Sequence, residues 1–427
     1  MTESFPPPGY IPTASTVEGI QIYMPAPPKE DETPQVVDFT CPQCGATTAY
    51  SVSDGGLRCA HCGYYEPPKG QTVGKRAEEF EFTLETMQIA AHGWGEARKE
   101  LVCQNCGATT SLSADALAHT CAFCGSNQVI FRDASQEMLR PRYLIPFKLE
   151  AEQCQHISSQ WLASSWMTPA QLKQITQIQS FSGVYLPFWT FDSTTSAGWR
   201  GEVAHTTTER YYDAGDRSWK TRTKTVWRWE SGQVRLVIDD LLVEGTNRLS
   251  RLLLDRIKKY QLGELADYDP KYLAGLQALA YNVLLEDAWD TAREQMREQT
   301  RQACVAQATS NRIRNFSMNL DFNDETWRYI LLPLYIAVYP YGGKTFQVMI
   351  NGQTGAISGQ RPVDWNKVWL VITAILAPGV LLSLAGLVTA IFGGIGIILA
   401  GIGFSLLIAG IVISIIIYIK AQKMDDV

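Results

Sequence analysis

The chain has 427 residues, of which 46% are hydrophobic, and it carries a formal net charge of -6. This length allows two or three domains with hydrophobic cores. No apolar segment follows the initiator Met, so the sequence predicts no signal peptide and argues against a secreted protein that uses its ten Cys as disulfides.

Residues 1–37 are rich in Pro, as in "SFPPPGYIPTAS" and "PAPPKEDETP". Pro favours extended backbone, and the segment has little apolar surface to bury. We therefore expect a disordered, extended arm.

Eight of the ten Cys form CxxC pairs, and the phrase "CPQCGATT" is nearly repeated as "CQNCGATT". In both repeats fourteen residues separate two pairs, which lets a hairpin bring four thiolates around one tetrahedral zinc ion. A Gly follows the second Cys of every pair, because such a turn favours a positive φ. We expect zinc ribbons at 38–66 and 101–131, joined by a linker at 67–100 that contains a short helix. The predicted ligands of two Zn²⁺ ions are Cys41, Cys44, Cys59, Cys62, Cys103, Cys106, Cys121 and Cys124.

A four-thiolate zinc site has no open position for water or substrate, so these sites are expected to be structural. A thioredoxin-like redox site would need one CxxC motif near a βαβ unit, which four pairs at ribbon spacing argue against. His61 and His119 lie beside the clusters, but two complete sets of Cys favour ordinary surface histidines. Cys154 and Cys304 lie outside the pattern and are expected to be buried or without a role.

Zinc ribbons often bind nucleic acid, which requires a basic surface. Between Asp38 and Arg132, however, the chain has seven Lys and Arg against ten Asp and Glu. This balance favours protein contact, with nucleic acid as the less favoured partner.

Residues 132–360 are predicted to form a β-rich α+β domain. Aromatic and β-branched residues in 183–203 and 224–238 indicate strands, and 330–359 is typical of a meander. Its turns are expected at Gly342-Gly343 and at Asn351-Gly352, the second with the signature of a type I′ turn. Helices are expected near 151–164, 169–178, 245–260, 270–284 and 285–312. The similar stretches "LPFWTFDSTTSAGWRGEV" and "LPLYIAVYPYGGKTFQVMI" suggest two related β units that face each other.

Catalytic motifs are missing from the sequence: it contains no GxSxG, HExxH or phosphate-binding Gly loop. None of its five His has a metal-ligand spacing with another. Asp239 and Asp240 are adjacent acidic residues, for which a solvated pair is the simpler interpretation. We therefore expect a protein that is not an enzyme.

From Val368 to Ile419 there is no charged residue, and a segment of this length fits two membrane spans. "FGGIG" at 392–396 is the expected turn of a hairpin at 361–419, with helices near 368–390 and 395–419. Basic residues flank both ends of the segment, which places the N-terminal domains and the tail at 420–427 in the cytoplasm. Small residues recur four apart and let helices approach within one hairpin or between the protomers of a homo-oligomer. These small residues are Gly386, Ala390, Gly394, Gly401, Ser405 and Ala409.

The motifs "CQNCGATT…CAFCGSNQVI", "IPFKL", "GVYLPFWTFD", "YDPKYLAGLQALAYNV" and "LLPLYIAVYPYGGKTFQVMINGQTGAISG" occur in this order. Through them the chain resembles the bacterial TFIIB-type zinc-ribbon membrane proteins over most of 101–360 and into the C-terminal spans. The resemblance implies a membrane dock for SPFH (flotillin-like) or phage-shock-type proteins at the inner membrane. The first ribbon and the Pro-rich arm depart from the family's pattern.

The expected architecture is multi-domain: two four-cysteine zinc ribbons, a β-rich α+β cytoplasmic domain and a C-terminal two-helix transmembrane hairpin. The leading hypothesis is a non-enzymatic membrane-anchored adaptor that docks protein partners under membrane stress. The alternative is a membrane-tethered nucleic-acid-binding protein. A third hypothesis is a membrane-bound hydrolase whose site is assembled from scattered residues.

Overall fold

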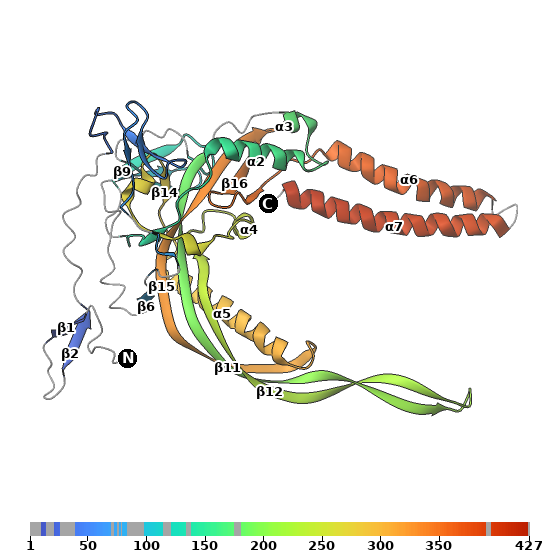
Figure 1. The fold of residues 1–427 in the computed structure, drawn as a ribbon. Coiled ribbons are helices and arrows are strands. Elements are labelled where there is room, and N and C mark those ends of the chain that lie inside the picture. Colours follow the sequence, from blue (N-terminus) through green and yellow to red (C-terminus); the bar gives the residue numbers. More distant parts are fainter. Residues whose placement is uncertain are drawn as a thin grey trace.

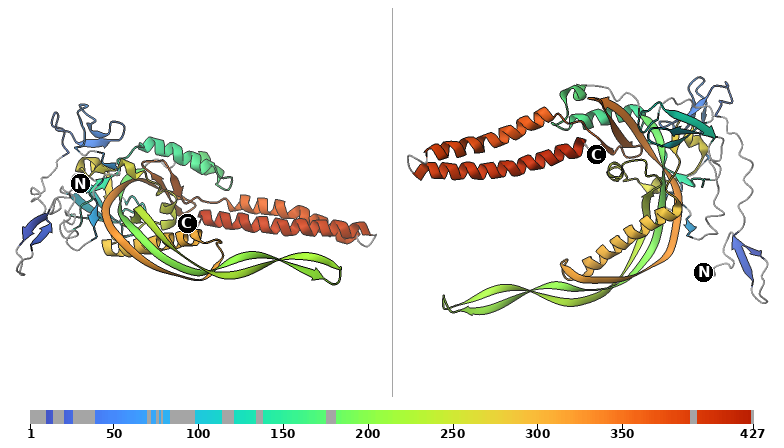
Figure 2. Two further views of the ribbon diagram at one scale, coloured as in Figure 1. Left: turned by 60° about the horizontal axis from the view of Figure 1, so that its bottom comes forward. Right: turned by 180° about the vertical axis from the view of Figure 1, so that it is seen from behind.

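The structure, a computed structural model, describes residues 10–13, 21–25, 39–69, 72–74, 77, 79–82, 98–113, 121–133, 138–174, 181–389 and 394–425. A strongly curved β-sheet forms the centre of the molecule (Figure 1). A two-helix hairpin and a two-stranded ribbon project from this centre, and in the views of Figures 1 and 2 both extend toward the same side.

The large sheet has 12 strands in the described part of the chain. Its strands are β6 Phe80–Glu81, β7 Arg98–Cys103, β8 Thr109–Ser113, β9 Val129–Asp133, β10 Tyr143–Leu144, β11 Ser182–Asp213, β12 Ser218–Glu244, β13 Ala266–Asp267, β14 Gln277–Leu279, β15 Ile313–Tyr341, β16 Lys344–Asn351 and β17 Ile357–Gly359. The helices are α2 Ala151–Ala163, α3 Ala170–Gln174, α4 Arg251–Asp255, α5 Leu285–Gln307, α6 Trp365–Thr389 and α7 Gly394–Asp425, with 3₁₀ turns at Leu262–Glu264 and Pro270–Leu273.

Two very long strands form the centre of the sheet. β11 has 32 residues and β15 has 29, and they pair antiparallel from Ser182 to Val203 of β11. Two register shifts in this pairing mark bulges, which increase the twist and bend of a strand. Beyond Val203, β11 pairs only with β12 among the described residues, so these two strands continue as a free ribbon (Figure 1).

Alternate residues of β11 build two hydrophobic cores on opposite faces of the sheet, as the two-residue period of a strand requires. Tyr185, Trp189 and Phe191 belong to one core, which α2 and α5 cover. Leu186 and Phe188 belong to the other, together with residues of α4 and the second Cys cluster. The long strands of the sheet curve around α5, which lies on their concave side (Figure 1).

The expected strands and three of the expected helices are confirmed, with helices at Ala151–Ala163, Ala170–Gln174 and Leu285–Gln307. The long helix predicted at 245–260 is reduced to Arg251–Asp255. The helix predicted at 270–284 is wrong. Pro270 begins a short 3₁₀ turn, Gly275 has φ +75°, and Gln277–Leu279 is a strand that pairs with β11 and β8.

The two predicted turns of the meander have different outcomes. Gly342 and Gly343 both have positive φ (58° and 78°), as a two-residue hairpin turn with this twist requires. The type I′ turn predicted at Asn351-Gly352 is wrong. The chain turns later, where the Gly355 N–H donates to the Asn351 carbonyl over 2.9 Å and Gly355 has φ +75°.

Within the segment expected to be disordered, β1 (Tyr10–Thr13) and β2 (Ile22–Pro25) pair as an antiparallel hairpin. The rest of that segment lies outside the described residues. Most of the linker at 67–100, in which a short helix was expected, lies outside them as well.

α6 and α7 form the C-terminal hairpin, and both are long and apolar enough to cross a membrane. The turn expected at 392–396 is described only from Gly394, where α7 already begins, and 390–393 lie outside the described residues. Gly401, Ser405 and Ala409 of α7 are exposed, so they do not form the contact within the hairpin, and contact between protomers through them stays a prediction. The buried glycines recur instead every seven positions, at Gly379 and Gly386 of α6 and at Gly396, Gly403 and Gly410 of α7.

Candidate metal centres

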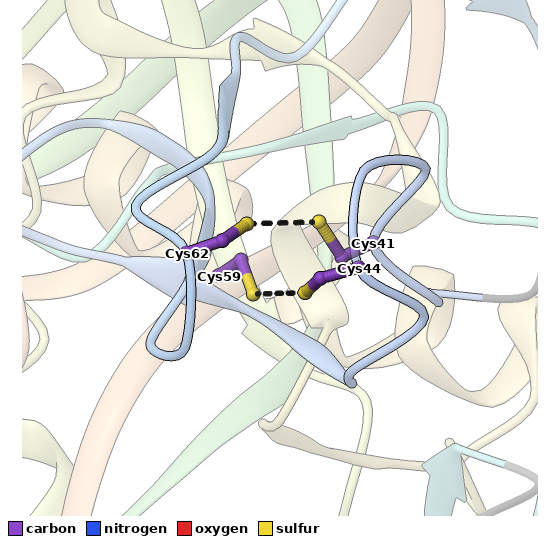
Figure 3. Close-up of side chains that lie close together, drawn as sticks. All are labelled: Cys41, Cys44, Cys59 and Cys62. Carbon is purple, nitrogen blue, oxygen red and sulfur yellow. Dashed lines mark hydrogen bonds between the residues drawn. The ribbon is translucent and has the colours of Figure 1, made fainter.

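The first Cys cluster joins two tight turns that carry the CxxC pairs (Figure 3). The Cys41 and Cys62 sulfurs lie 3.4 Å apart, and those of Cys44 and Cys59 lie 3.5 Å apart. All four Sγ atoms lie within 4.8 Å of one another, and none forms a disulfide. Strands β3 (Thr48–Ser51), β4 (Gly56–Cys59) and β5 (Tyr65–Glu66) form the small sheet that holds the turns in place.

The second cluster repeats this geometry. The Cys103–Cys124 and Cys106–Cys121 sulfur distances are 3.6 Å and 3.7 Å, and the four thiols are again free. Tetrahedral zinc with Zn–S bonds of about 2.3 Å would place its sulfurs about 3.8 Å apart, so both clusters have room for such an ion. All eight predicted ligands are thus brought together as the two sets of four that the spacing indicated.

The turns are alike in their backbone as well as in their sulfurs. The Gly after the second Cys donates its N–H to the carbonyl of the first Cys, over 2.8 Å at Gly45 and 2.9 Å at Gly125. The four glycines have φ between +71° and +78°: Gly45, Gly63, Gly107 and Gly125. A side chain with a Cβ rarely adopts this conformation, which explains the Gly at every turn.

Backbone N–H groups in the turns point at the sulfurs and stabilise thiolates. The N–H groups of Cys62 and His61 lower the pKa of Cys59 to about 6, although partial desolvation raises it. At Cys103, burial raises the pKa, but the N–H groups of Cys106 and Asn105 outweigh it and bring the pKa to about 7. Although backbone N–H groups also reach Cys44 and Cys62, partial desolvation and the neighbouring sulfurs raise their pKa, and burial raises the pKa of Cys106 and Cys121. A thiolate is the form that binds a metal ion, so the turns prepare one Cys of each cluster for a cation.

The other Cys and His near the clusters are not ligands where the structure describes them. His61 is exposed and its ring lies outside the four-sulfur group, while His119 lies outside the described residues. Cys154 and Cys304 are fully buried, which was one of the two alternatives expected for them. Burial raises the pKa of Cys154 to about 12.

The two clusters are attached to the domain in different ways. The first forms its own three-stranded sheet and packs Leu57 and Phe39 against Ala274. An ion pair from Lys271 to Glu66 at 2.6 Å, a hydrogen bond from the Tyr50 N–H to the Ala274 carbonyl over 3.0 Å and a ring contact between Tyr50 and Tyr272 add to that contact. The second is continuous with the large sheet, because β8 pairs with β14, and Cys103 and Cys121 belong to one of its cores.

The structure contains a cluster of charges around Arg328 that was not predicted from the sequence. Arg328 is only 2% exposed, and its guanidinium contacts Asp240 and lies 3.4 Å from both Asp192 and Glu79. Asp240 therefore pairs with a buried cation, and the interpretation of Asp239-Asp240 as a solvated pair is wrong for Asp240. The signal was the single Arg inside the otherwise apolar "WRYILLPLY".

Burial raises the pKa of Asp192 to about 7, partly offset by the Asp240 N–H and by Arg328. Oxygen atoms of Glu79, Asp192 and Asp239 lie within 4.8 Å of one another. Arg328 supplies one positive charge among these carboxylates, and the negative charges of Glu79 and Asp240 contribute to the raised pKa of Asp192.

The chain is similar to the uncharacterized protein YdjG of Bacillus subtilis (strain 168). The two are 28% identical over 362 residues, which is 84% of this chain and 99% of YdjG. No family model matches the chain. No solved structure matches it.

Proposed function

We propose that the protein is a non-enzymatic adaptor with two zinc ribbons, anchored by α6 and α7 in a bacterial inner membrane, that docks protein partners at the cytoplasmic surface. Each ribbon holds one Zn²⁺ through four thiolates, which leaves the metal closed to substrate. The ion therefore folds the module, and its surface is left for protein contact.

The orientation follows from charges at one end of the hairpin. Arg361 precedes α6, and Lys367 lies in its first turn. Lys420 and Lys423 lie near the end of α7. All four are at the end of the hairpin nearest the folded domain, and an excess of Lys and Arg marks the cytoplasmic side of a span. Trp365 and Trp369 pack on Tyr418 at the same end, with ring centroids 5.6 Å and 6.3 Å apart, as expected at a membrane interface.

The observation that carries the docking role is the free ribbon of β11 and β12. Trp219 is 64% exposed on this ribbon, and Trp229 is 62% exposed at its base, opposite Glu202. Large exposed aromatic side chains are typical of protein interfaces. The ribbon extends toward the side on which α6 and α7 leave the domain (Figure 2), but its Lys and Arg exclude a position in the hydrocarbon. A partner at the membrane surface would cover it.

The partner class comes from the resemblance of the sequence to zinc-ribbon membrane proteins: SPFH (flotillin-like) or phage-shock-type proteins. Affinity purification of the full chain from native membranes tests the proposal, with W219A/W229A as the variant and W166A as the matched control. Trp166 is also an exposed Trp (44%) but lies away from the ribbon. Recovery of such a partner with the wild type and the control, and its loss with W219A/W229A, is the expected result. Equal recovery with all three proteins contradicts it.

A second candidate, nucleic-acid binding, is favoured by the charge of β12. Between Ser218 and Ile238 this strand has five basic residues and one acidic residue: Lys220, Arg222, Lys224, Arg228, Arg235 and Glu230. Two-stranded ribbons can enter a DNA major groove. Two of the cations are already engaged, however, since Lys220 pairs with Asp213 at 2.7 Å and Arg222 with Glu209 at 3.0 Å. Fluorescence anisotropy of labelled DNA and RNA with the detergent-solubilised chain would detect such binding, with a steep loss of affinity as salt rises.

A further inference from the structure

A pocket of about 500 Å³ lies where the end of α7 meets the folded domain. Arg256 follows α4, Arg361 lies between β17 and α6, and Lys420 and Lys423 are on the last turns of α7. These four side chains line the pocket, and its lining includes no carboxylate. None of the four forms an ion pair within the part of the chain that the structure describes. Among the described residues the pocket is therefore a concentrated positive charge without a counter-ion.

Arg361 is held in place rather than free in solvent. Its guanidinium lies 3.7 Å from the centre of the Trp161 ring, and its Nη1 donates to Ser164 Oγ over 3.1 Å. Its backbone N–H donates to the Met424 carbonyl over 3.0 Å, which ties the end of α7 to the domain. Burial lowers the pKa of Arg361 to about 10, so the side chain stays charged at neutral pH although it has lost part of its hydration. An anion in the pocket would compensate this loss.

The pocket is apolar on the side that faces along the hairpin. Ile416 and Ile419 of α7 line it and are exposed by 59% and 46%. Both precede Lys420 and Lys423 by about one turn, so the lining changes from apolar to basic along the helix axis. Tyr418, in contact with Trp365 and Trp369, marks the membrane interface at the same level.

We propose that this pocket binds an anionic phospholipid, with the headgroup phosphate among Arg256, Arg361, Lys420 and Lys423 and an acyl chain along Ile416 and Ile419. The order of apolar and basic groups matches the order of chain and headgroup in a lipid of the cytoplasmic leaflet. This inference rests on the proposed membrane anchor, because only a hairpin in the bilayer brings lipid to the pocket. The bound lipid would fix the domain against the end of the hairpin.

The test uses the full chain purified in a neutral detergent and measures thermal unfolding with added phosphatidylglycerol, phosphatidylcholine or inorganic phosphate. Phosphatidylglycerol is expected to raise the unfolding temperature of the wild type, and phosphatidylcholine and phosphate are not. In K420Q/K423Q, which changes two exposed side chains, the concentration of phosphatidylglycerol needed for half of the shift should rise about tenfold or more. R361Q should behave in the same way. R251Q changes an exposed Arg of α4 outside the pocket and should match the wild type.

Equal shifts with phosphatidylcholine, or an unchanged response of K420Q/K423Q, would overturn the proposal. An equal shift with inorganic phosphate would show that the pocket takes free phosphate and would overturn the assignment to lipid. Extraction of membranes at alkaline pH separates failure of the proposed lipid site from failure of the membrane anchor. A chain that stays in the membrane but shows no preference for phosphatidylglycerol contradicts only the lipid site, whereas a chain that is extracted contradicts the anchor itself.

Discussion

Leu186 of β11 and Leu332 of β15 lie directly opposite each other, and the sheet has the same arrangement on both sides of this pair. On one side β10 pairs in parallel with β15, and this pairing begins at Ile330, two residues before Leu332. On the other side β14 pairs in parallel with β11, and this pairing begins at Val184, two residues before Leu186. A helix follows each short strand, α2 after β10 and α5 after β14. A two-fold axis through the Leu pair relates these elements.

The residue after each Leu extends this symmetry. The Pro187 carbonyl accepts from the Gly245 N–H, and the Pro333 carbonyl accepts from the Gly352 N–H, both over 2.9 Å. The two Leu-Pro stretches that look alike in the sequence therefore occupy equivalent positions. This is the geometry that an internal duplication produces, with each half contributing a short strand, a helix, a long strand and its hairpin partner.

The close approach at these glycines gives a first prediction. A Cβ at Gly352 would lie 2.6 Å from the Phe147 ring, and one at Gly245 would lie 3.0 Å from Pro187. We expect G352A to lower the free energy of unfolding by about 1–3 kcal/mol and G245A to lower it by less. Gly263 has open space around its Cβ position, so G263A is the matched control. Denaturant titration followed by Trp fluorescence measures this, and an unchanged G352A would contradict the packing described here.

The different attachment of the two metal centres gives a second prediction. C44S and C106S should each reduce the bound zinc from two ions to one per chain, as measured by elemental analysis of the purified protein. C106S should lower the unfolding temperature of the domain more than C44S, because the second cluster is continuous with the large sheet and the first is not. Loss of both ions from either variant, or equal destabilisation, would show that the clusters are coupled.

The buried charges around Arg328 predict a pH dependence. The folded-state pKa of Asp192 is about 7, above the ordinary value near 4, so folding favours the protonated carboxyl. The stability contributed by this proton is fully present below the ordinary pKa and is lost as the pH rises through about 7. The unfolding free energy of the wild type should therefore fall between about pH 4 and pH 7, and D192N should show a shallower slope over this range.

The matched control for this measurement is D290N, because Asp290 is exposed on α5 and does not belong to the cluster. Its pH profile should follow that of the wild type. Burial also raises the pKa of Asp240, so D192N should retain part of the slope. If the wild type and D192N have parallel profiles over this range, the account of the Arg328 cluster is wrong.

The contact between α6 and α7 predicts which small residues are essential. A Cβ at Gly403 would collide with the backbone of Ser383, whereas one at Gly401 would meet nothing within 4 Å. We expect G403L to separate the helices and lower the unfolding temperature of the detergent-solubilised chain by several degrees, with no change for G401L. The opposite result would restore the contact face that the spacing of four residues had suggested.

The two Cys clusters could be predicted from the sequence because their rules are local. The spacing of the CxxC pairs and the Gly after each pair determine which sulfurs meet, and the structure brings all eight together as expected. The apolar C-terminal hairpin is similarly evident from the length of its uncharged segment. The face through which α7 contacts α6 could not be predicted. Small residues recur in α7 at spacings of both seven and four, and only the packing of the two helices selects between them.

The rest of the fold depends on contacts between residues far apart in the chain. Gln277–Leu279 is a strand because β8 and β11 lie on either side of it, although its Leu and Ala residues favour a helix. The ion-pair network of Arg328 combines residues from three strands and from position 79. Neither feature has a spacing rule that a single sequence reveals.

Site-specific photo-crosslinking from position 219 in native membranes tests the proposed adaptor role most directly. A photoreactive residue in place of Trp219 should form an adduct with a membrane-associated SPFH or phage-shock-type protein. The same residue in place of the exposed Leu252 of α4 should not form it. Adducts from position 219 with nucleic acid, or the absence of any protein adduct, would contradict the account.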